Sequence, residues 1–310
     1  MPRLSPAPSA QPQLRPYQEA GVAWLRDRPR AFLADEAGLG KSRQFVEAAR
    51  GRTLVVAPGM VLDGGTWDEE TERWARDPGA FTQVAYSSLN TRVKTGANAS
   101  ATRPTDELKP EYREPWDSVI LDEAHYIKGR KSHWTKAVLN LKAEQVHLGT
   151  GTPIPNWADE LFIPLQVLHP EKAHPGGELG SYWRWAREWF DCSPTRWSQG
   201  MPSVGELLAC SPACLDRPPT DPCGHYLEFA EANLGDLFLQ RLRDDVLTDL
   251  PPLTKVIVET PMTKAQAAAY NALKKDFVAW AGEHGEEIVA WNEAALNEQL
   301  IKLSVGLDVI

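Results

Sequence analysis

Residues 31–42 of the chain read AFLADEAGLGKS, in which a short apolar run leads into a glycine-containing loop. The apolar run, Ala31 to Ala34, has the length of a buried strand, and Lys41 and Ser42 open the segment that follows. Backbone N–H groups of such a loop, together with the N-terminus of the next helix, form a cradle for phosphate oxygens. The stretch therefore predicts a strand, a phosphate-binding loop and a helix in that order.

The side chains of this loop indicate how it would hold ATP. Lys41 would neutralise the β- and γ-phosphates, and the Ser42 hydroxyl would bind Mg²⁺. Ala34 stands where the general pattern G-x-x-x-x-G-K-[ST] has its first glycine. The alternative is a glycine-rich turn that binds nothing. The loop residues predicted to bind ATP are Asp35, Glu36, Ala37, Gly38, Leu39, Gly40, Lys41 and Ser42.

A pair of carboxylates, Asp122 and Glu123, directly follows the apolar run 119–121. In a parallel α/β sheet, ligands bind at the carboxyl ends of the strands. Asp122 would hold Mg²⁺, and Glu123 would orient or deprotonate an attacking water. Together with Lys41 these acids are the predicted catalytic residues of a nucleotide hydrolase, although an isolated Asp-Glu pair can also be a solvated turn.

Short apolar runs recur along the first half of the chain and alternate with amphipathic segments. This alternation predicts an α/β fold whose parallel sheet is covered by helices on both faces. The polar interval 92–115 is expected to be a surface excursion. The predicted strands are 31–34, 53–57, 84–86, 118–121 and 145–148, and the amphipathic segments between them include 41–50 and 133–141.

The composition excludes several classes of protein. With 310 residues the chain has room for about two domains at ~150 residues each, and 42% hydrophobic residues argue against wholesale disorder. Its 33 basic and 42 acidic residues give a net charge of −9, which leaves room only for a local basic groove. Four cysteines are too few for a disulfide scaffold. No apolar run approaches the ~18 residues of a membrane span, so we expect no membrane partner and a cytoplasmic location, nucleoid-associated when DNA is bound.

Three motifs together resemble a known family. Residues 35–42 (DEAGLGKS), 122–125 (DEAH) and 149–153 (GTGTP) look like motifs I, II and III of superfamily 2 helicases. Their detail resembles the SNF2-like branch, the double-stranded-DNA translocases. Further segments similar to that branch, in the family's order, are 14–22, 55–58 followed by Trp67 and Trp74, 86–89, 237–246 followed by Leu250-Pro251, and 263–277.

The resemblance implies the first RecA-like lobe of a DNA-dependent ATPase that uses ATP and Mg²⁺ and walks on double-stranded DNA. It adds Gln18 as the residue that reads adenine. The residues that would couple nucleotide to DNA are His125, Thr150, Gly151 and Thr152. Those that would touch the DNA backbone without reading sequence are Pro58, Gly59, Ser87 and Ser88.

The family also has a second RecA-like lobe, which carries an arginine finger. No segment like it is found here, so we expect the second lobe to lie on another polypeptide or to be missing from this sequence, and we expect the chain alone to hydrolyse ATP poorly. The predicted division is a disordered tail (1–13), the RecA-like lobe (14–169), an irregular or helical protrusion with the end of the lobe (170–259), and the helical start of an incomplete second lobe (260–310).

The protrusion raises two further questions. Cys210, Cys214, Cys223 and His225 could form a zinc site, but their spacing is irregular and free thiols are the alternative. Tryptophans 183, 185, 189 and 197 could stack on bases or form a small helical core. For the whole chain, two other functions stay open: a strand-separating helicase, and an ATP- or DNA-binding regulatory module without turnover.

Overall fold

The structure, a computed structural model, describes residues 13–94, 102–154, 157–194, 203–210, 224–247, 262–264, 266–268 and 270–271. The chain divides into two compact units, Met1–Asp249 and Leu250–Ile310. In the second unit, the backbone N–H of Thr263 donates to Gln266 Oε1 at 2.9 Å and that of Gln266 donates to Thr263 Oγ1 at 3.2 Å. This reciprocal pair is a capping box, the arrangement that Thr263 followed by Gln266 predicts at the start of a helix. The sequence also predicts a strand at 255–259 and a helix at 286–303, both of which lie outside the described residues.

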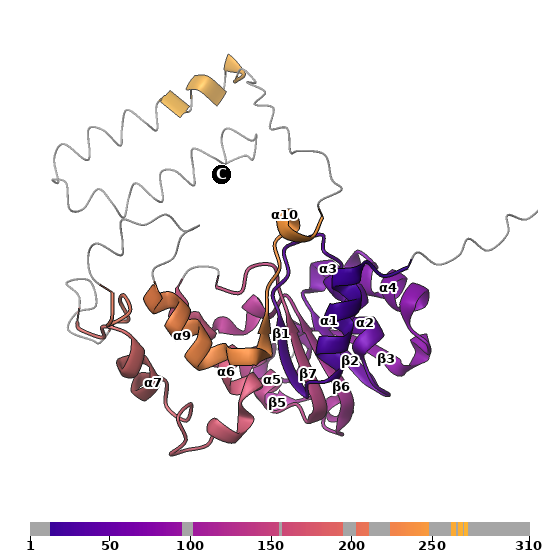
Figure 1. The fold of residues 1–310 in the computed structure, drawn as a ribbon, viewed down its shortest axis with the longest axis horizontal. Helices are drawn as coiled ribbons and strands as arrows, with labels where there is room; N and C mark the ends of the chain where they lie inside the picture. Colours follow the sequence, from indigo (N-terminus) through magenta and orange to yellow (C-terminus); the bar gives the residue numbers. More distant parts are fainter. Residues whose placement is uncertain are drawn as a thin grey trace, which may run out of the picture. The chain divides into compact units, whose positions relative to one another are not determined.

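A parallel sheet forms the centre of the first unit (Figure 1). Its six strands lie in the order β3-β2-β6-β7-β1-β8, and every neighbouring pair is parallel. All five predicted strands are present, and β8 is an additional one. The strands are β1 (Arg30–Leu33), β2 (Thr53–Ala57), β3 (Phe81–Ala85), β6 (Trp116–Asp122), β7 (Ala143–Gly149) and β8 (Phe238–Leu239).

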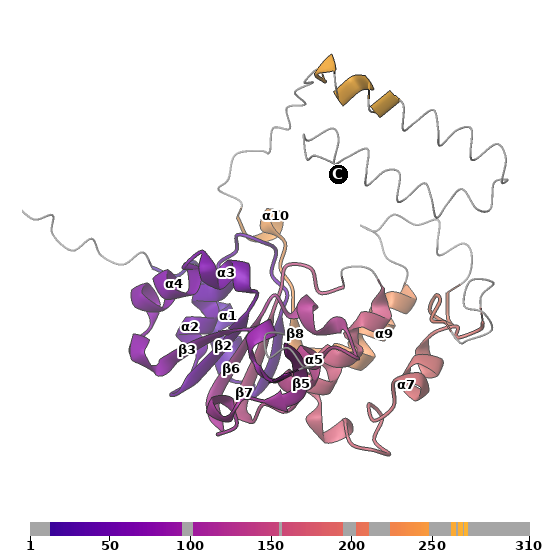
Figure 2. The ribbon, with the colours of Figure 1, turned by 180° about the vertical axis from the view of Figure 1, so that it is seen from behind.

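Helices cover both faces of this sheet. Alternate residues of a strand point to opposite sides, and both sides of these strands carry apolar residues that must be buried. On β2, Val55 and Ala57 join one apolar cluster, whereas Leu54 and Val56 join the other. The first cluster is completed by α1 (Pro16–Arg26), α2 (Lys41–Ala48) and α4 (Thr66–Trp74). The second is completed by α5 (His133–Leu139) and α6 (Phe162–Leu168), on the side that faces the reader in Figure 2. The predicted doubly covered α/β sheet is confirmed.

The interval 92–115 is more ordered than predicted. Strands β4 (Asn90–Lys94) and β5 (Thr102–Leu108) form an antiparallel pair, and the Leu108 side chain is buried. Asn90 fastens the pair to α5, since its amide donates to the carbonyl of Thr105 at 2.7 Å and to that of His133 at 2.8 Å. The predicted surface excursion is thus an exposed pair of strands, which the sequence did not reveal because exposed strands carry few of the apolar residues that mark a strand.

The protrusion has an aromatic core. Trp185, on α7 (Tyr182–Trp189), is buried and lies 5.4 Å from the Phe162 ring and 6.1 Å from the Phe229 ring, measured between centroids. Phe229 belongs to α9 (Gly224–Leu234). Trp185 is therefore a core residue and is not available for stacking on bases, whereas Trp197 lies outside the described residues. No helix in the described part of the chain is long and apolar enough to cross a membrane.

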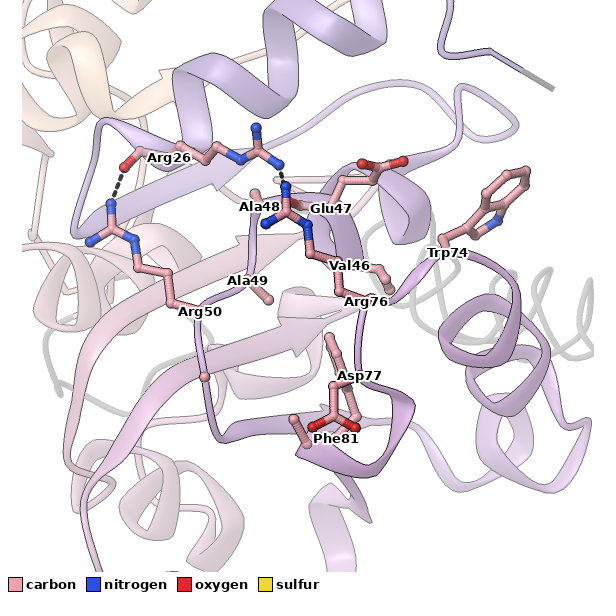
Figure 3. Close-up of a pocket in the computed structure, with 12 residues that line it drawn as sticks. Arg26, Val46, Glu47, Ala48, Ala49, Arg50, Trp74, Arg76, Asp77 and Phe81 are labelled. Atoms are coloured by element: carbon pink, nitrogen blue, oxygen red, sulfur yellow. Dashed lines mark hydrogen bonds between the residues drawn. The ribbon is translucent and has the colours of Figure 1, made fainter. Parts of the chain in front are cut away.

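A pocket of about 510 Å³ lies at the amino end of the strands, between the last turns of α1 and α2 and the segment that leads into β3 (Figure 3). Two arginines in it act as helix caps. Arg26 donates to the carbonyl of Glu47 at 2.6 Å, and Arg50 donates to the carbonyl of Arg26. Cationic side chains stabilise the carbonyl ends of helices in this way. The pocket is therefore part of the scaffold, at the opposite edge of the sheet from the loop 34–40.

His147 makes the fold sensitive to acid. Its ring is buried in β7, its Nε2–H donates a hydrogen bond to the Arg28 carbonyl at 3.1 Å, and burial lowers its pKa from 6.5 to about 4. Between these values the unfolded chain binds a proton that the folded chain does not, so stability falls as the pH drops. We expect wild type to lose about 2.5 kcal/mol more than His147→Gln between about pH 7.5 and about pH 4.5. Urea unfolding at both pH values measures this, and equal losses would contradict it.

Candidate active site

The loop 34–40 joins β1 to α2 at the carboxyl edge of the sheet, as predicted. Gly38 and Gly40 have φ angles of 89° and 73°, which belong to the left-handed region that glycine adopts without strain. A side chain at Gly40 would also displace the Gln18 amide, since a Cβ there would lie 2.4 Å from Gln18 Nε2. Lys41 then begins α2, so its backbone N–H and that of Ser42 lie at the first turn of the helix, where anions bind.

Lys41 lies among carboxylates. Its Nζ donates to the backbone carbonyl of Asp35 at 2.7 Å. Burial lowers the pKa of Lys41, while the charges of Glu123, Asp35 and Asp122 act in the opposite direction. Gly151 is close to the same ammonium, because a Cβ there would lie 3.7 Å from Lys41 Nζ. The loop lysine and the acidic pair, far apart in sequence, thus meet at one edge of the sheet.

Asp122 ends β6 and is held on several sides. Its Oδ2 accepts from the indole N–H of Trp67 at 2.9 Å, and its Oδ1 accepts from the backbone N–H of Glu123 at 3.0 Å. The Tyr86 hydroxyl donates to the Asp122 carbonyl at 2.9 Å. Burial raises the pKa of this carboxyl, and the hydrogen bond from Trp67 acts against that rise. A nearby cation would stabilise the charged form further.

Glu123 and motif III form one hydrogen-bonded group. Thr150 Oγ1 donates to Glu123 Oε2 at 2.8 Å, and His125 Nδ1 lies 3.0 Å from Thr150 Oγ1 and 3.2 Å from Glu123 Oε2. Thr152 contributes a backbone N–H to Thr150 Oγ1 at 3.1 Å. Glu123 has a φ of 49°, the only positive value at a residue other than glycine among the described residues. Such strain is concentrated at functional sites, and 35% of the Glu123 side chain is exposed, which leaves room for a water.

Two predicted ATP-binding side chains are engaged within the protein. The Asp35 carboxylate is fully buried against Arg241 and Gln44 and does not face the loop's open side. The Gln18 amide is also occupied, because Oε1 accepts from the Arg15 backbone N–H at 3.0 Å and Nε2 donates to the Leu39 carbonyl at 3.3 Å. Gln18 therefore supports the loop in this structure, and its reading of adenine stays a prediction.

The predicted DNA-contacting residues lie together at the carboxyl edge. Pro58 and Gly59 begin α3 (Gly59–Asp63) after β2, and Ser87 and Ser88 lie in the 3-10 turn η2 (Tyr86–Ser88) after β3. Because β2 and β3 are parallel neighbours, both turns emerge side by side. Two of the basic residues near motif II are already paired: Lys128 with Glu160 at 2.9 Å, and Arg130 with the ring of Tyr182 at 3.2 Å from its centroid.

The zinc prediction is only partly testable. Cys214 and Cys223 lie outside the described residues. Cys210 Sγ lies 3.9 Å from His225 Nδ1. Within the described ranges no cluster of three or more His, Cys, Asp or Glu side chains could hold a metal. The zinc site stays a prediction.

Sequence reasoning missed the supporting residues. Trp67 and Tyr86 were noted only as parts of motifs, although both bond to Asp122. Arg241 was noted only within a segment similar to the family's, although it binds the phosphate loop. For Trp67 and Tyr86 the available signal was their place next to the predicted DNA-contacting motifs. For Arg241 it was its place in the segment 237–246, which is similar to a segment of the SNF2-like branch.

The residues present fit a magnesium nucleotide. Ser42 supplies a hydroxyl and Asp122 a carboxylate, the oxygen ligands that Mg²⁺ prefers. Lys41 supplies the cation for phosphate, and the left-handed glycines Gly38 and Gly40 open the backbone to an anion. A strand, phosphate loop and helix beside an acidic pair define a nucleotide-binding α/β protein.

Comparisons with known proteins agree. The model of the SNF2-related domain matches residues 17–304, so the chain belongs to the SNF2-related domain family. It is 27% identical to the ISWI chromatin-remodeling complex ATPase ISW1 of Saccharomyces cerevisiae over 298 residues, which cover 89% of this chain and 24% of that protein. It is 27% identical to the DNA annealing helicase and endonuclease ZRANB3 of Bos taurus over 285 residues, covering 86% and 24%. The chain thus spans about a quarter of the length of these two relatives.

A solved structure supports the fold. The Sulfolobus solfataricus SWI2/SNF2 ATPase core in complex with dsDNA superposes with a TM-score of 0.54 at 22% identity, covering 98% of this chain and 60% of that one. The predicted RecA-like fold of the SNF2 branch is confirmed.

Proposed function

We propose that this chain is the ATP-binding lobe of a DNA-dependent ATPase that translocates on double-stranded DNA. One observation carries the proposal: Lys41, Asp122 and Glu123 meet at the carboxyl edge of the sheet, and Thr150 of motif III donates to Glu123 at 2.8 Å. Membership of the SNF2-related domain family supports ATP as the nucleotide and duplex DNA as the partner.

In this proposal each residue has a defined role. Lys41 binds the β- and γ-phosphates, and Ser42 and Asp122 hold Mg²⁺, which when bound supplies positive charge to the reacting phosphoryl oxygens. Glu123 positions the attacking water and accepts its proton. Thr150 and His125 hold the Glu123 carboxylate in place, so a movement of motif III changes the geometry of the base.

We further propose that full hydrolysis needs a second RecA-like lobe, which supplies an arginine finger. The chain covers 60% of the length of the SWI2/SNF2 ATPase core on which it superposes, which supports this proposal. A cytoplasmic, nucleoid-associated location follows from the same proposal and stays a prediction.

Two rival functions have separate tests. A strand-separating helicase would displace a labelled strand from a duplex when ATP is present, whereas a translocase would displace a third strand from a triplex and leave the duplex paired. A regulatory module without turnover would bind ATP and DNA but show no steady-state hydrolysis with the second lobe supplied. Displacement of the duplex strand, or binding without any hydrolysis, would each replace the proposed function.

The contact with DNA is expected to involve only the backbone. Gly59, Ser87 and Ser88 offer backbone N–H groups and the two serines also offer hydroxyls, none of which reads sequence, whereas Pro58 has no N–H and shapes the turn. We expect two duplexes of unrelated sequence to bind equally, and the affinity to fall as the salt concentration rises, because cationic side chains that neutralise DNA phosphates release counterions. Fluorescence anisotropy of labelled duplexes measures both properties. Binding that depends on sequence, or that ignores salt, would contradict this contact.

A further inference from the structure

The phosphate loop is fastened to a segment that lies about 200 positions later in the sequence. This return segment, residues 239–243, follows β8, which pairs in parallel with β1. Beyond the last paired residues, the backbone N–H of Ala34 donates to the Leu239 carbonyl at 2.7 Å, and that of Glu36 donates to the Arg241 carbonyl at 3.0 Å. The ladder between the strands therefore continues into the loop itself.

Between these two backbone bonds, the Arg241 guanidinium forms two hydrogen bonds with the carboxylate of Asp35. Its Nε donates to Oδ1 at 2.9 Å and its Nη2 donates to Oδ2 at 2.5 Å, a forked pair with charge on both partners. Asp35 is fully buried, and only 13% of the Arg241 side chain is exposed. The same guanidinium donates to Gln44 Oε1 at 2.7 Å and to the Tyr17 carbonyl. One side chain thus joins the loop, helix α2 and helix α1.

Arg243 extends the attachment by two more bonds. Its backbone N–H donates to Glu36 Oε2 at 2.7 Å, and its guanidinium donates to the Ala37 carbonyl at 2.5 Å. Each of the four consecutive loop residues from 34 to 37 therefore has a hydrogen bond to the return segment. The position of the Lys41 ammonium depends on this attachment. Its Nζ donates to the backbone carbonyl of Asp35, and Arg241 binds the Asp35 side chain.

We propose that Arg241 is a positioning residue for nucleotide binding: through Asp35 it holds the phosphate loop in the ordered conformation of this structure. A loop that is already ordered loses little conformational entropy when the ligand binds, and this raises affinity. The inference rests on the proposed binding of ATP. It goes further by assigning the conformation of the loop to a residue outside motifs I, II and III.

The assignment has a consequence for communication along the chain. The return segment continues through α10 (Arg243–Val246), and the second compact unit begins in sequence at Leu250. A change in the position of this connection would first affect Arg241 and Arg243. Through them it would affect the loop proposed to bind phosphate. Nucleotide affinity would then respond to the state of whatever follows Leu250 in the chain.

The test compares the MgATP affinity of the full chain with its unfolding midpoint, using a fluorescent ATP analogue. Arg241→Gln removes the fork and Arg241→Lys keeps the charge without the fork, which a lysine cannot reproduce. Asp35→Asn combined with Arg241→Gln removes both buried charges, so the penalty for an unpaired charge disappears and stability should recover. Arg28→Gln is the matched control, since Arg28 pairs with Asp236 at 3.4 Å, just before the return segment but away from the loop.

We expect Arg241→Gln, Arg241→Lys and the double variant each to bind MgATP roughly tenfold more weakly than wild type, and Arg28→Gln to bind it normally. In the double variant, stability returns toward wild type while affinity stays low, which a merely structural role would not produce. Wild-type affinity in the folded double variant or in Arg241→Lys would overturn the inference. If wild type itself binds no MgATP, the proposed function fails instead.

Discussion

Replacing Lys41 with alanine is expected to weaken the binding of MgATP to this chain by roughly 100-fold, because a phosphate would lose its half-buried cationic partner. The ammonium of Lys41 lies at the first turn of α2 and is drawn toward the loop by the Asp35 carbonyl at 2.7 Å. Among the described residues, two further cations lie at the loop, Arg241 and Arg243, and both donate to the loop itself. Equilibrium titration with a fluorescent ATP analogue measures the loss.

The matched control for this prediction is Lys136→Ala. Lys136 lies on α5 in an exposed ion pair with Asp106 at 2.7 Å, away from the loop. Its loss should leave the affinity for MgATP unchanged. Equal affinity in Lys41→Ala and wild type would show that the phosphate site has been assigned wrongly.

Replacing Glu123 with glutamine is expected to leave MgATP binding within a few-fold of wild type and to lower hydrolysis by about 10²- to 10⁴-fold. Glutamine has the same shape and keeps an oxygen that can accept from Thr150 Oγ1, now 2.8 Å from the carboxylate. It cannot accept a proton from water. Steady-state hydrolysis and nucleotide titration, with the second lobe supplied in the hydrolysis assay, separate the two effects.

Glu107→Gln serves as the control, because Glu107 is in an exposed pair with Arg113 at 3.4 Å. It should hydrolyse ATP at the wild-type rate. A Glu123→Gln protein that retains full hydrolysis would exclude Glu123 as the base, and one that loses binding would give it a role in holding the nucleotide.

The central strands could be predicted because their residues are buried on both faces. Leu54 and Val55 point to opposite cores, so β2 reads as an unbroken apolar run. The hairpin β4-β5 is exposed, and polar residues such as Arg92 and Thr102 conceal it. Strand β8 contains only Phe238 and Leu239, too few residues for any periodicity to show.

The residues proposed to carry out the chemistry could be predicted from the sequence, whereas the residues that hold them in place could not. Lys41, Asp122 and Glu123 lie in local motifs whose residue types state their roles, and the parallel sheet brings the motifs to one edge. The ion pair of Asp35 with Arg241 joins residues that only the folded chain brings together. For the same reason Asp35, predicted to bind ATP, has its carboxylate buried against an arginine in the structure.

The strained backbone of Glu123 was equally beyond sequence reasoning. A φ of 49° at a glutamate follows from the bonds that fix its neighbours, Asp122 to Trp67 and Tyr86, and its own carboxylate to Thr150. Trp67 and Tyr86 are next to the predicted DNA-contacting turns in sequence or in the fold. The network therefore joins the nucleotide edge to the surface on which we propose that DNA lies.

Duplex-DNA stimulation of ATP hydrolysis tests the central claim most directly. With the second lobe supplied, the steady-state rate is measured without DNA and with two duplexes of unrelated sequence, for wild type and for Glu123→Gln. The account predicts that both duplexes raise the wild-type rate equally and that Glu123→Gln stays at background. A wild-type rate that is the same with and without duplex DNA would contradict it.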